Sequence, residues 1–343
     1  MLKLTVIDQS PIQLGSIDKR PAIHLSLDLA QNCEDWGYSR YWLAEHHNTS
    51  FFSGPAPEIL ISHIASNTKT IRVGSGGIML SHYSPYKVAE QFRMLETLYP
   101  GRIDLGIGRA PGGDQLATAA LAYPNNPTHG ELYSRQAHDL KCYLEGGFEE
   151  NHPFKNLKVL PTSHSNKDDT KPELWMLGSS GGSAALAGHL GMGLSLGLFI
   201  GPMGQTTDIT DEYKQAFKNA GHKGKPKVMI AVGGVCADTT EEAFHLASSQ
   251  VYKKTLATSR GDNDPWISPE DVQKRLSNLS PVEERYYRKL MNSFIIGSPA
   301  ECKEQMHKLS QYWQTDDIAI LTVTHDYESR KKSYQLFAEQ LLG

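Results

Sequence analysis

The stretch RYWLAEHHNTSFFSG, residues 40–54, shows the pattern that decides the fold. A short apolar run at 41–44 ends abruptly in Glu45, His46 and His47. Short runs rich in Val, Ile, Leu or aromatic residues are typical of strands buried in a parallel sheet. Two interpretations of the polar ending are open. Either the three residues close a strand for structural reasons, or they face a pocket in which a reaction takes place.

The same kind of apolar run recurs along the chain and alternates with amphipathic segments. Strands are predicted at residues 2–7, 38–43, 71–77, 103–107, 173–177, 193–199, 227–233 and 318–322. Helices are predicted at residues 22–36, 57–67, 85–99, 130–144, 182–190, 206–220, 240–257, 299–312 and 329–342. Strands that are each followed by a helix over this length predict a (β/α)8 TIM barrel. A doubly wound open sheet, with a second domain, is the alternative.

Two segments fit neither a strand nor a helix of the predicted barrel. Residues 151–171 form an insertion before the fifth strand, and residues 259–294 form a segment rich in charge and Pro after the seventh unit. Loops of this length in a compact domain are often lids or binding loops. No linker rich in Pro, Gly or Ser separates two halves, so we predict one domain over residues 1–343 with two insertions.

Composition excludes several classes of protein. The formal net charge of −4 gives no electrostatic reason to expect nucleic acid or an anionic membrane as a partner. No apolar run approaches the roughly 20 residues that span a bilayer, and the N-terminal residues read as a strand rather than a signal peptide. The four cysteines are scattered without a CxxC pair, which favours a reducing cytoplasm over a secreted protein with two disulfides.

The polar residues at the predicted strand ends are the candidates for chemistry. His46 and His47 suit proton transfer, because histidine titrates near neutral pH. Neighbours on a strand point to opposite sides, so at least one of them should face the site. Structural hydrogen bonds at a strand end are the alternative. No HExxH spacing follows, and we therefore predict no metal site.

Glycines and an arginine end the third and fourth predicted strands. The run RVGSGGIML places Ser75, Gly76 and Gly77 where backbone can approach a ligand closely, although an ordinary tight turn is equally open. In GRIDLGIGRAPGGD the glycine spacing is GxGxxxG, which is not the dinucleotide-binding fingerprint. Arg109 is instead a candidate ligand for an anion, with a surface ion pair as its alternative.

The run ELWMLGSSGGSAALAGHLG contains the best candidate for a phosphate site. A predicted strand ends at Leu177, and a turn and the start of an Ala-rich helix follow, comprising Gly178, Ser179, Ser180, Gly181 and Gly182. Free backbone N–H groups and the helix dipole favour an anion at such a point. Simple N-capping by serine is the alternative.

Together these motifs resemble the bacterial luciferase-like, flavin-dependent monooxygenases, in particular the single-subunit members. The resemblance rests on IDQSPI, GYSRYWLAEHHN, the segment from IRVGSGG to GRAPGGD, ELWMLGSSG and GSPAECKEQ. It implies a (β/α)8 barrel with insertions that binds flavin mononucleotide (FMN). Reduced FMN from a separate NAD(P)H:flavin reductase would react with O2 to form a C4a-hydroperoxide, which would attack a small organic substrate.

The resemblance also implies roles for individual residues. His46, with His47 beside it, corresponds to the family's proton-transfer histidine. A non-proline cis peptide maps to Gly76–Gly77, phosphate ligands map to Arg109 and to the turn from Ser179 to Gly182, and His129 and Tyr133 have the spacing of a further cofactor-binding pair. Luciferase itself has a cysteine at the position of Gly108 and an acid at Gly178, so light emission with a long-chain aldehyde is not implied.

Three other functions stay open at the level of sequence. A hydride-transfer enzyme that uses the deazaflavin F420 has the same barrel, some relatives bind flavin without catalysis, and a metal-dependent hydrolase also fits a barrel. Family relatives dimerise through the helices after the second and third strands. APEILISHIASN and YKVAEQFRMLETLY have apolar residues at helical spacing there, so we expect a homodimer.

Overall fold

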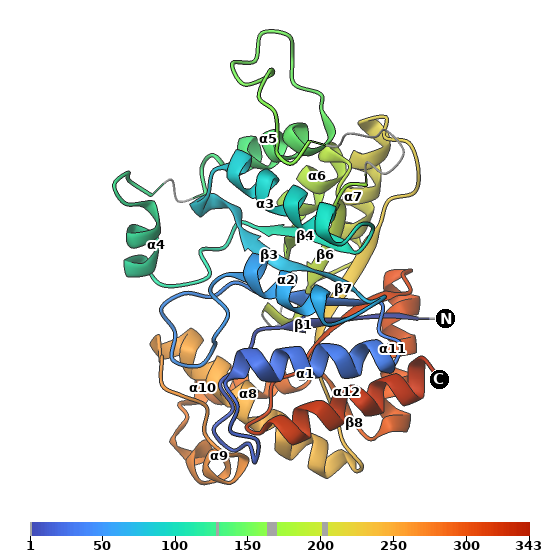
Figure 1. The fold of residues 1–343 in the computed structure, drawn as a ribbon. Helices are drawn as coiled ribbons and strands as arrows, with labels where there is room; N and C mark the ends of the chain where they lie inside the picture. Colours follow the sequence, from blue (N-terminus) through green and yellow to red (C-terminus); the bar gives the residue numbers. More distant parts are fainter. Residues whose placement is uncertain (1, 128–129, 163–169, 201–204) are drawn as a thin grey trace.

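The computed structural model describes residues 2–127, 130–162, 170–200 and 205–343, and at its centre is a closed barrel of parallel strands (Figure 1). The strands pair around the ring in the order β1-β2-β3-β4-β5-β6-β7-β9, and β9 pairs with β1. They are β1 (Lys3–Asp8), β2 (Arg40–Leu43), β3 (Arg72–Met79), β4 (Ile103–Gly108), β5 (Glu173–Gly178), β6 (Gly193–Gly197), β7 (Val228–Cys236) and β9 (Asp317–Leu321). The predicted (β/α)8 barrel is confirmed.

Helices surround this ring and connect its strands. They are α1 (Ala22–Asp35), α2 (Pro57–Ser66), α3 (Pro85–Leu98), α4 (Gln115–Ala122), α5 (Tyr133–Glu145), α6 (Gly181–Leu190), α7 (Asp208–Asn219), α8 (Thr240–Arg260), α9 (Pro269–Arg275), α10 (Pro281–Met291), α11 (Pro299–Trp313) and α12 (Tyr327–Leu341). Short 3-10 helices are η1 (Leu80–His82), η2 (Leu198–Ile200) and η3 (Leu276–Asn278), and a short strand β8 (Ile295–Gly297) pairs with the end of β7. In Figure 1 both chain termini lie at the same side of the molecule.

Among the α-helices and strands, four were not predicted from the sequence: α4, α9, α10 and β8. β8 is short enough to escape a pattern search, and α4 follows the irregular run from Arg109 to Asp114. Helices α9 and α10 each begin with serine followed by proline, at Ser268 and Ser280. A capping serine before Pro at the first helical position is a helix-start signal, so residues 259–294 contain helices where a long irregular loop was expected.

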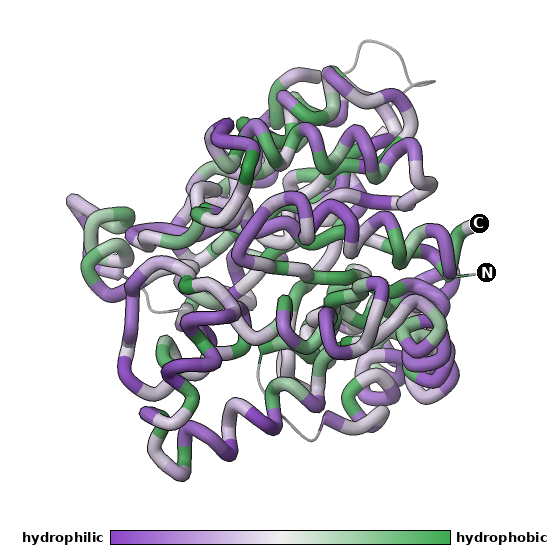
Figure 2. Tube along the Cα trace, turned by 90° about the horizontal axis from the view of Figure 1, so that it is seen from below, coloured by the Kyte–Doolittle hydropathy of each residue, from purple (hydrophilic) through white to green (hydrophobic). Residues whose placement is uncertain are grey.

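The barrel interior is filled by large side chains below the strand ends. Trp42 on β2 and Trp175 on β5 meet edge to face, with ring centroids 5.5 Å apart. They pack with smaller residues from the other strands, including Ile7, Met229 and Ala231. In Figure 2, apolar and polar residues alternate along the outer helices, as expected for helices with one face against the barrel. This packing fills the barrel interior beneath the strand ends.

The connection between α8 and α9 lies over the loop that follows β2. Trp266 donates a hydrogen bond from its indole nitrogen to the carbonyl oxygen of Phe51, at 3.2 Å. Its ring contacts the rings of Phe51 and Phe52, at centroid distances of 5.4 and 5.8 Å. The Ser50 hydroxyl donates to the carbonyl oxygen of Asn263 in the same region. This connection therefore covers the side of the barrel from which the EHH motif emerges.

Candidate active site

A cavity of about 520 Å³ lies at the carboxyl ends of the barrel strands, where barrel enzymes carry their active sites. We call it the central cavity, and its volume suits a small-molecule ligand. The predicted site residues in its wall are His46, Gly76, Gly77, Arg109, Gly178, Ser179 and Ser180. The wall also includes Ile7, Gln9, Met79, Leu177, Ser195, Phe199 and Ala231. The structure therefore brings together residues on or next to seven of the barrel strands that are far apart in the sequence.

The other predicted residues lie outside the described wall of this cavity: His47, Ser75, Tyr133, Gly181 and Gly182. The Ser75 hydroxyl donates to the carbonyl oxygen of Gly106 at 2.8 Å and accepts from its N–H at 3.1 Å, which ties β3 to β4. Tyr133 is buried at the start of α5, where burial raises the pKa of its hydroxyl. That hydroxyl lies 3.5 Å from the carbonyl oxygen of Ile107. His129 lies outside the described residues.

His46 presents a neutral imidazole to the central cavity. The side-chain nitrogen of Gln9 donates to its Nε2 at 3.4 Å, and its ring packs against Phe52 with centroids 4.3 Å apart. Its Nδ1 is buried and has no hydrogen-bond partner among the described residues. Burial, and then the neighbouring charge of His47, lower the pKa of His46 to about 4. Near neutral pH the ring is therefore uncharged and one of its nitrogens is available to a ligand.

His47 makes a different set of contacts. Its Nε2 lies 2.7 Å from Oε1 of Glu45, a carboxylate that is only 1% exposed. The Tyr83 hydroxyl donates to the same oxygen at 2.7 Å, and the backbone N–H of Met79 donates to Oε2 at 2.9 Å. Glu45 thus joins the end of β2 to the end of β3. The structure therefore places His46 in the cavity wall and His47 in a hydrogen-bond network at the end of β2.

Gly76 and Gly77 form part of the cavity wall with bare backbone. The peptide bond between them is cis, as the resemblance implied. A Cβ on Gly77 would lie 2.8 Å from the carbonyl oxygen of Gly106, and one on Gly76 would lie 3.0 Å from Cβ of Trp42. Gly77 therefore has no room for a side chain, and Gly76 has little. The absence of side chains leaves a smooth backbone surface that a flat ligand can approach closely.

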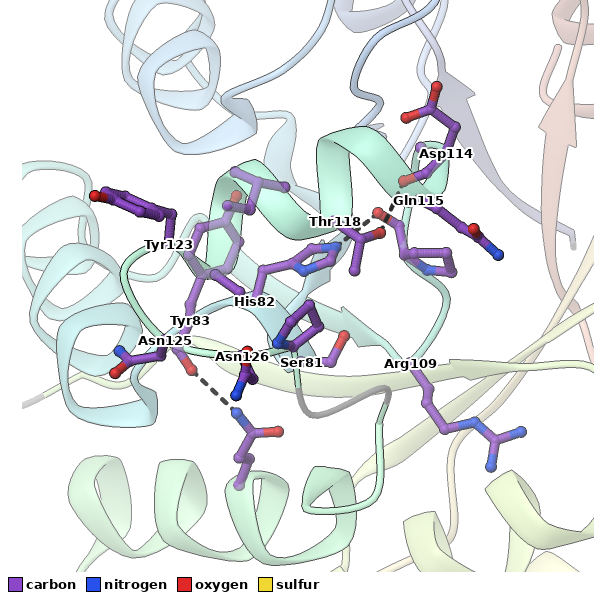
Figure 3. Close-up of a pocket in the computed structure, with 16 residues that line it drawn as sticks. Ser81, His82, Tyr83, Arg109, Asp114, Gln115, Thr118, Tyr123, Asn125 and Asn126 are labelled. Carbon is purple, nitrogen blue, oxygen red and sulfur yellow. Dashed lines mark hydrogen bonds between the residues drawn. The ribbon is translucent and has the colours of Figure 1, made fainter.

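Arg109 lies between the central cavity and a second cavity of about 710 Å³, which we call the side cavity. Figure 3 shows the side cavity and the Arg109 side chain, whose guanidinium points away from the labelled residues of η1 and α4. Arg109 is exposed and forms no ion pair with any residue that the structure describes. The alternative of a surface ion pair is therefore not realised here, and the guanidinium is available to an anion.

The turn between β5 and α6 lies on the other side of the central cavity. Ser180 is the N-cap of α6, but within the described chain its side chain makes no capping hydrogen bond. The amide of Gln205 donates to the carbonyl oxygen of Ser179 at 3.1 Å and holds the turn against β6. A carboxylate also approaches this helix start, because a Cβ on Gly181 would lie 2.5 Å from Oε2 of Glu212. Simple serine capping thus does not account for the turn.

Comparison with known proteins identifies the family. The family model described as luciferase-like monooxygenase matches residues 3–315. The chain belongs to the luciferase-like monooxygenase family. It is 41% identical to the uncharacterized Bacillus subtilis protein YwcH, over 99% of both chains. It is 35% identical to the N-acetyl-S-alkylcysteine monooxygenase of Bacillus subtilis, over 100% of this chain and 99% of that protein.

Solved structures show the same fold over the whole chain. The structure of apo-MsnO8 has a TM-score of 0.84 and is 33% identical, covering 100% of this chain and 99% of that one. Among more distant structures, the oxygenating constituent of 3,6-diketocamphane monooxygenase from Pseudomonas putida, in complex with FMN, has a TM-score of 0.72 at 18% identity, covering 99% and 97%. An F420-dependent secondary alcohol dehydrogenase, in complex with an F420-acetone adduct, has a TM-score of 0.70 at 14% identity, covering 98% and 97%.

As a luciferase-like monooxygenase, the protein is an enzyme of the oxidoreductase class. Within the described residues, no group of three or more His, Cys, Asp and Glu side chains is placed to hold a metal ion. No helix in the described ranges is long and apolar enough to cross a membrane.

Some residues of the wall were missed at the level of sequence. Ser195 lies within a predicted strand and not at its polar end. Alternation along a strand is the signal that applies to Ser195, since residues two apart share one face. Phe199 lies in the short helix η2, which was predicted to be the end of a strand. Only the folded chain shows which face of each strand lines the cavity.

Proposed function

We propose that this luciferase-like monooxygenase binds FMN in the central cavity and uses the reduced cofactor with O2 to oxidise a small organic substrate. One observation carries the proposal: three features meet in one cavity. They are a guanidinium without an ion-pair partner and a helix start without a side-chain cap, both judged among the described residues, and a wall of bare glycine backbone. The guanidinium and the helix start suit the phosphate of FMN and the glycine wall suits its ring, so the residues present fit the cofactor.

The phosphate of FMN would be held between Arg109 and the turn that begins α6. A guanidinium binds phosphate through two parallel hydrogen bonds. The first N–H groups of a helix have no partner within the helix and favour an anion. The hydroxyls of Ser179 and Ser180 lie in the same wall and add donors. The combination supports a dianionic phosphate more strongly than either element alone.

The ring of the cofactor would lie against Gly76 and Gly77, with His46 at its edge. When bound and reduced, the flavin supplies the electrons that activate O2. The protein positions the ring, limits the access of water and moves protons. His46 suits the last task because its imidazole is neutral and its Nδ1 has no partner among the described residues. Ile7, Phe199 and Ala231 form an apolar part of the wall that suits an organic substrate.

F420 is the second candidate cofactor, since one structure with this fold binds it. The side cavity next to Arg109 favours FMN over F420. Its described wall contains Arg109 as its only arginine or lysine and also contains the Asp114 carboxylate. A cofactor that continues beyond its phosphate into an anionic tail would meet few cations there. The shorter FMN ends at the phosphate and needs none.

Two further parts of the proposal concern the surroundings of the enzyme. Reduced FMN would come from a separate NAD(P)H:flavin reductase, as the resemblance implies. We also infer that the protein works in the cytoplasm. All four cysteines are buried as free thiols, which supports a reducing compartment.

Oxygen uptake tests the catalytic proposal. The purified protein would be mixed with FMN, NADH, a flavin reductase and a panel of organic substrates, including N-acetyl-S-alkylcysteines, on which a relative acts by name. Substrate-dependent product formation that His46→Ala reduces at least tenfold supports a monooxygenase. FMN binding without product from any substrate favours a non-catalytic flavin-binding protein. Tighter binding of F420 than of FMN favours the hydride-transfer alternative.

A further inference from the structure

The floor of the central cavity contains a buried hydroxyl that the barrel leaves without a partner. Ser195 lies in the middle of β6 and is 2% exposed. Its Oγ forms no hydrogen bond with any residue in the described ranges. It shares the inward face of β6 with Gly197, two residues further on, and both line the cavity. A buried polar group in this state is unusual in a folded protein and calls for an explanation.

The side chains next to Ser195 do not explain why its hydroxyl has no partner. Its register partners in the sheet, Leu177 on β5 and Met229 on β7, have apolar side chains and offer its hydroxyl no hydrogen-bond partner. The serine on β3 is satisfied by the protein itself. The Ser75 hydroxyl on β3 both donates to and accepts from the backbone of Gly106. A purely structural role would leave Ser195 with such a contact.

The position of Ser195 in the ring relates it to His46. Strand β6 is four places from β2 in the closed ring of eight, so the two strands lie on opposite sides of the cavity. His46 follows β2. Its Nδ1, like the Oγ of Ser195, is buried and has no hydrogen-bond partner in the described chain. A ligand that satisfied both would be wide and would carry polar atoms at separated edges. A flat heterocycle with ring carbonyls has this character.

We propose that the Ser195 hydroxyl donates a hydrogen bond to a carbonyl oxygen of the isoalloxazine ring when the cofactor is bound. Ser195 is then a cofactor-binding residue, on the side of the cavity opposite His46. This inference rests on the proposed function, because it needs a flavin in the central cavity. It adds a contact to the ring, whereas Arg109 and the α6 turn would contact the phosphate.

The test is the variant Ser195→Ala, studied without turnover. Dissociation constants for FMN, riboflavin and lumiflavin would be measured by fluorescence titration, together with the melting temperature of the flavin-free protein. Lumiflavin has the ring but neither the ribityl chain nor the phosphate. We expect a loss of affinity of about 3- to 10-fold for all three ligands, the range expected for one neutral hydrogen bond. The melting temperature should be unchanged or higher, because the variant removes a buried hydroxyl that the apoprotein does not satisfy.

Ser333→Ala is the matched control. Ser333 is also fully buried, but its Oγ accepts a hydrogen bond from the N–H of Cys236 at 2.9 Å, away from the cavity. This variant should lower the melting temperature and leave all three dissociation constants unchanged. A structural serine and a ligand-binding serine therefore give opposite patterns.

Each other outcome overturns the inference in a recognisable way. Unchanged affinities in Ser195→Ala, with normal flavin binding by the wild type, would refute the ring contact and leave the proposed function intact. A loss for FMN and riboflavin but not for lumiflavin would move the contact to the ribityl chain. If the wild type bound none of the three ligands, the proposed function itself would fail, and the inference with it.

Discussion

His47 Nε2 lies 2.7 Å from the buried carboxylate of Glu45, whereas the ring of the adjacent His46 lines the central cavity. The two neighbouring histidines therefore make different contacts. The Glu45 carboxylate also accepts from Tyr83 and Met79, so it connects the end of β2 with the turn after β3. The network fixes the strand end from which His46 reaches the cavity.

Removing His47 should destabilise the protein more than it changes cofactor binding. His47→Ala leaves Glu45 with one donor fewer in a buried site, which costs about 1.5–3 kcal/mol for a hydrogen bond to a charged group. Urea unfolding should show this loss, and the FMN dissociation constant should change less than twofold. His24→Ala, at an exposed position on α1, is the control and should do neither. A stable His47→Ala protein that had lost its activity would show that His47 is catalytic.

His46 should make the stability depend on pH in the acid range. The unfolded chain takes up a proton on this ring near its ordinary pKa of 6.5, but burial lowers the pKa in the folded protein to about 4. Between these values the unfolded state binds more protons, so stability falls as the pH falls from 6.5 to 4. In His46→Gln the melting temperature should therefore fall less between pH 7 and pH 4.5. An identical fall in variant and wild type would mean that His46 titrates normally in the folded protein.

Glu212 should weaken FMN binding. Its carboxylate approaches the start of α6, where the phosphate of FMN is proposed to bind. Removing a negative charge near an anion bound at a helix start should strengthen its binding free energy by about 0.3–1 kcal/mol. Glu212→Gln should therefore tighten FMN binding about 2- to 5-fold at low salt, with a smaller gain at high salt. Asp211→Asn, which changes a neighbouring exposed charge on α7, is the control. A weaker affinity in Glu212→Gln would instead mark Glu212 as a ligand for the cofactor.

The outer faces of α2 and α3 should form a homodimer interface. Ile59 is 70% exposed, Met94 50% and Leu98 56%, so large apolar side chains lie on the surface of the helices after the second and third strands. Light scattering should show a dimer for the wild type and a monomer for Leu98→Asp. Leu116→Asp, on α4, carries the same change at another exposed leucine and should stay dimeric. A wild-type monomer at micromolar concentration would remove this prediction.

The ring of strands was predictable because its signal is local. Each strand is a short apolar run that ends in Gly or polar residues, and such runs are visible one at a time. The short strand β8 and helices α4, α9 and α10 were missed for different reasons. β8 has too few residues for a periodic pattern, and the Ser-Pro starts of α9 and α10 lay in a segment whose charge and proline content resembled a loop.

The site was predictable in position but not in detail. The ends of parallel strands meet in a barrel, so His46, Gly77, Arg109 and Ser180 were expected together and are together. The different contacts of His46 and His47 depend on the hydrogen bonds of Glu45, which join positions more than thirty residues apart. Likewise, the isolation of the Ser195 hydroxyl depends on what the neighbouring strands fail to provide. Such facts arise only when the chain is folded.

The most direct test of the account compares the binding of FMN and riboflavin, which differ only in the phosphate. The wild type should bind FMN at least tenfold more tightly than riboflavin, because Arg109 and the α6 turn would contact only the phosphate. Arg109→Gln should remove most of this difference by weakening FMN and leaving riboflavin unchanged. Equal affinity of the wild type for both ligands, or no binding of either at tens of micromolar, would contradict the proposed cofactor site.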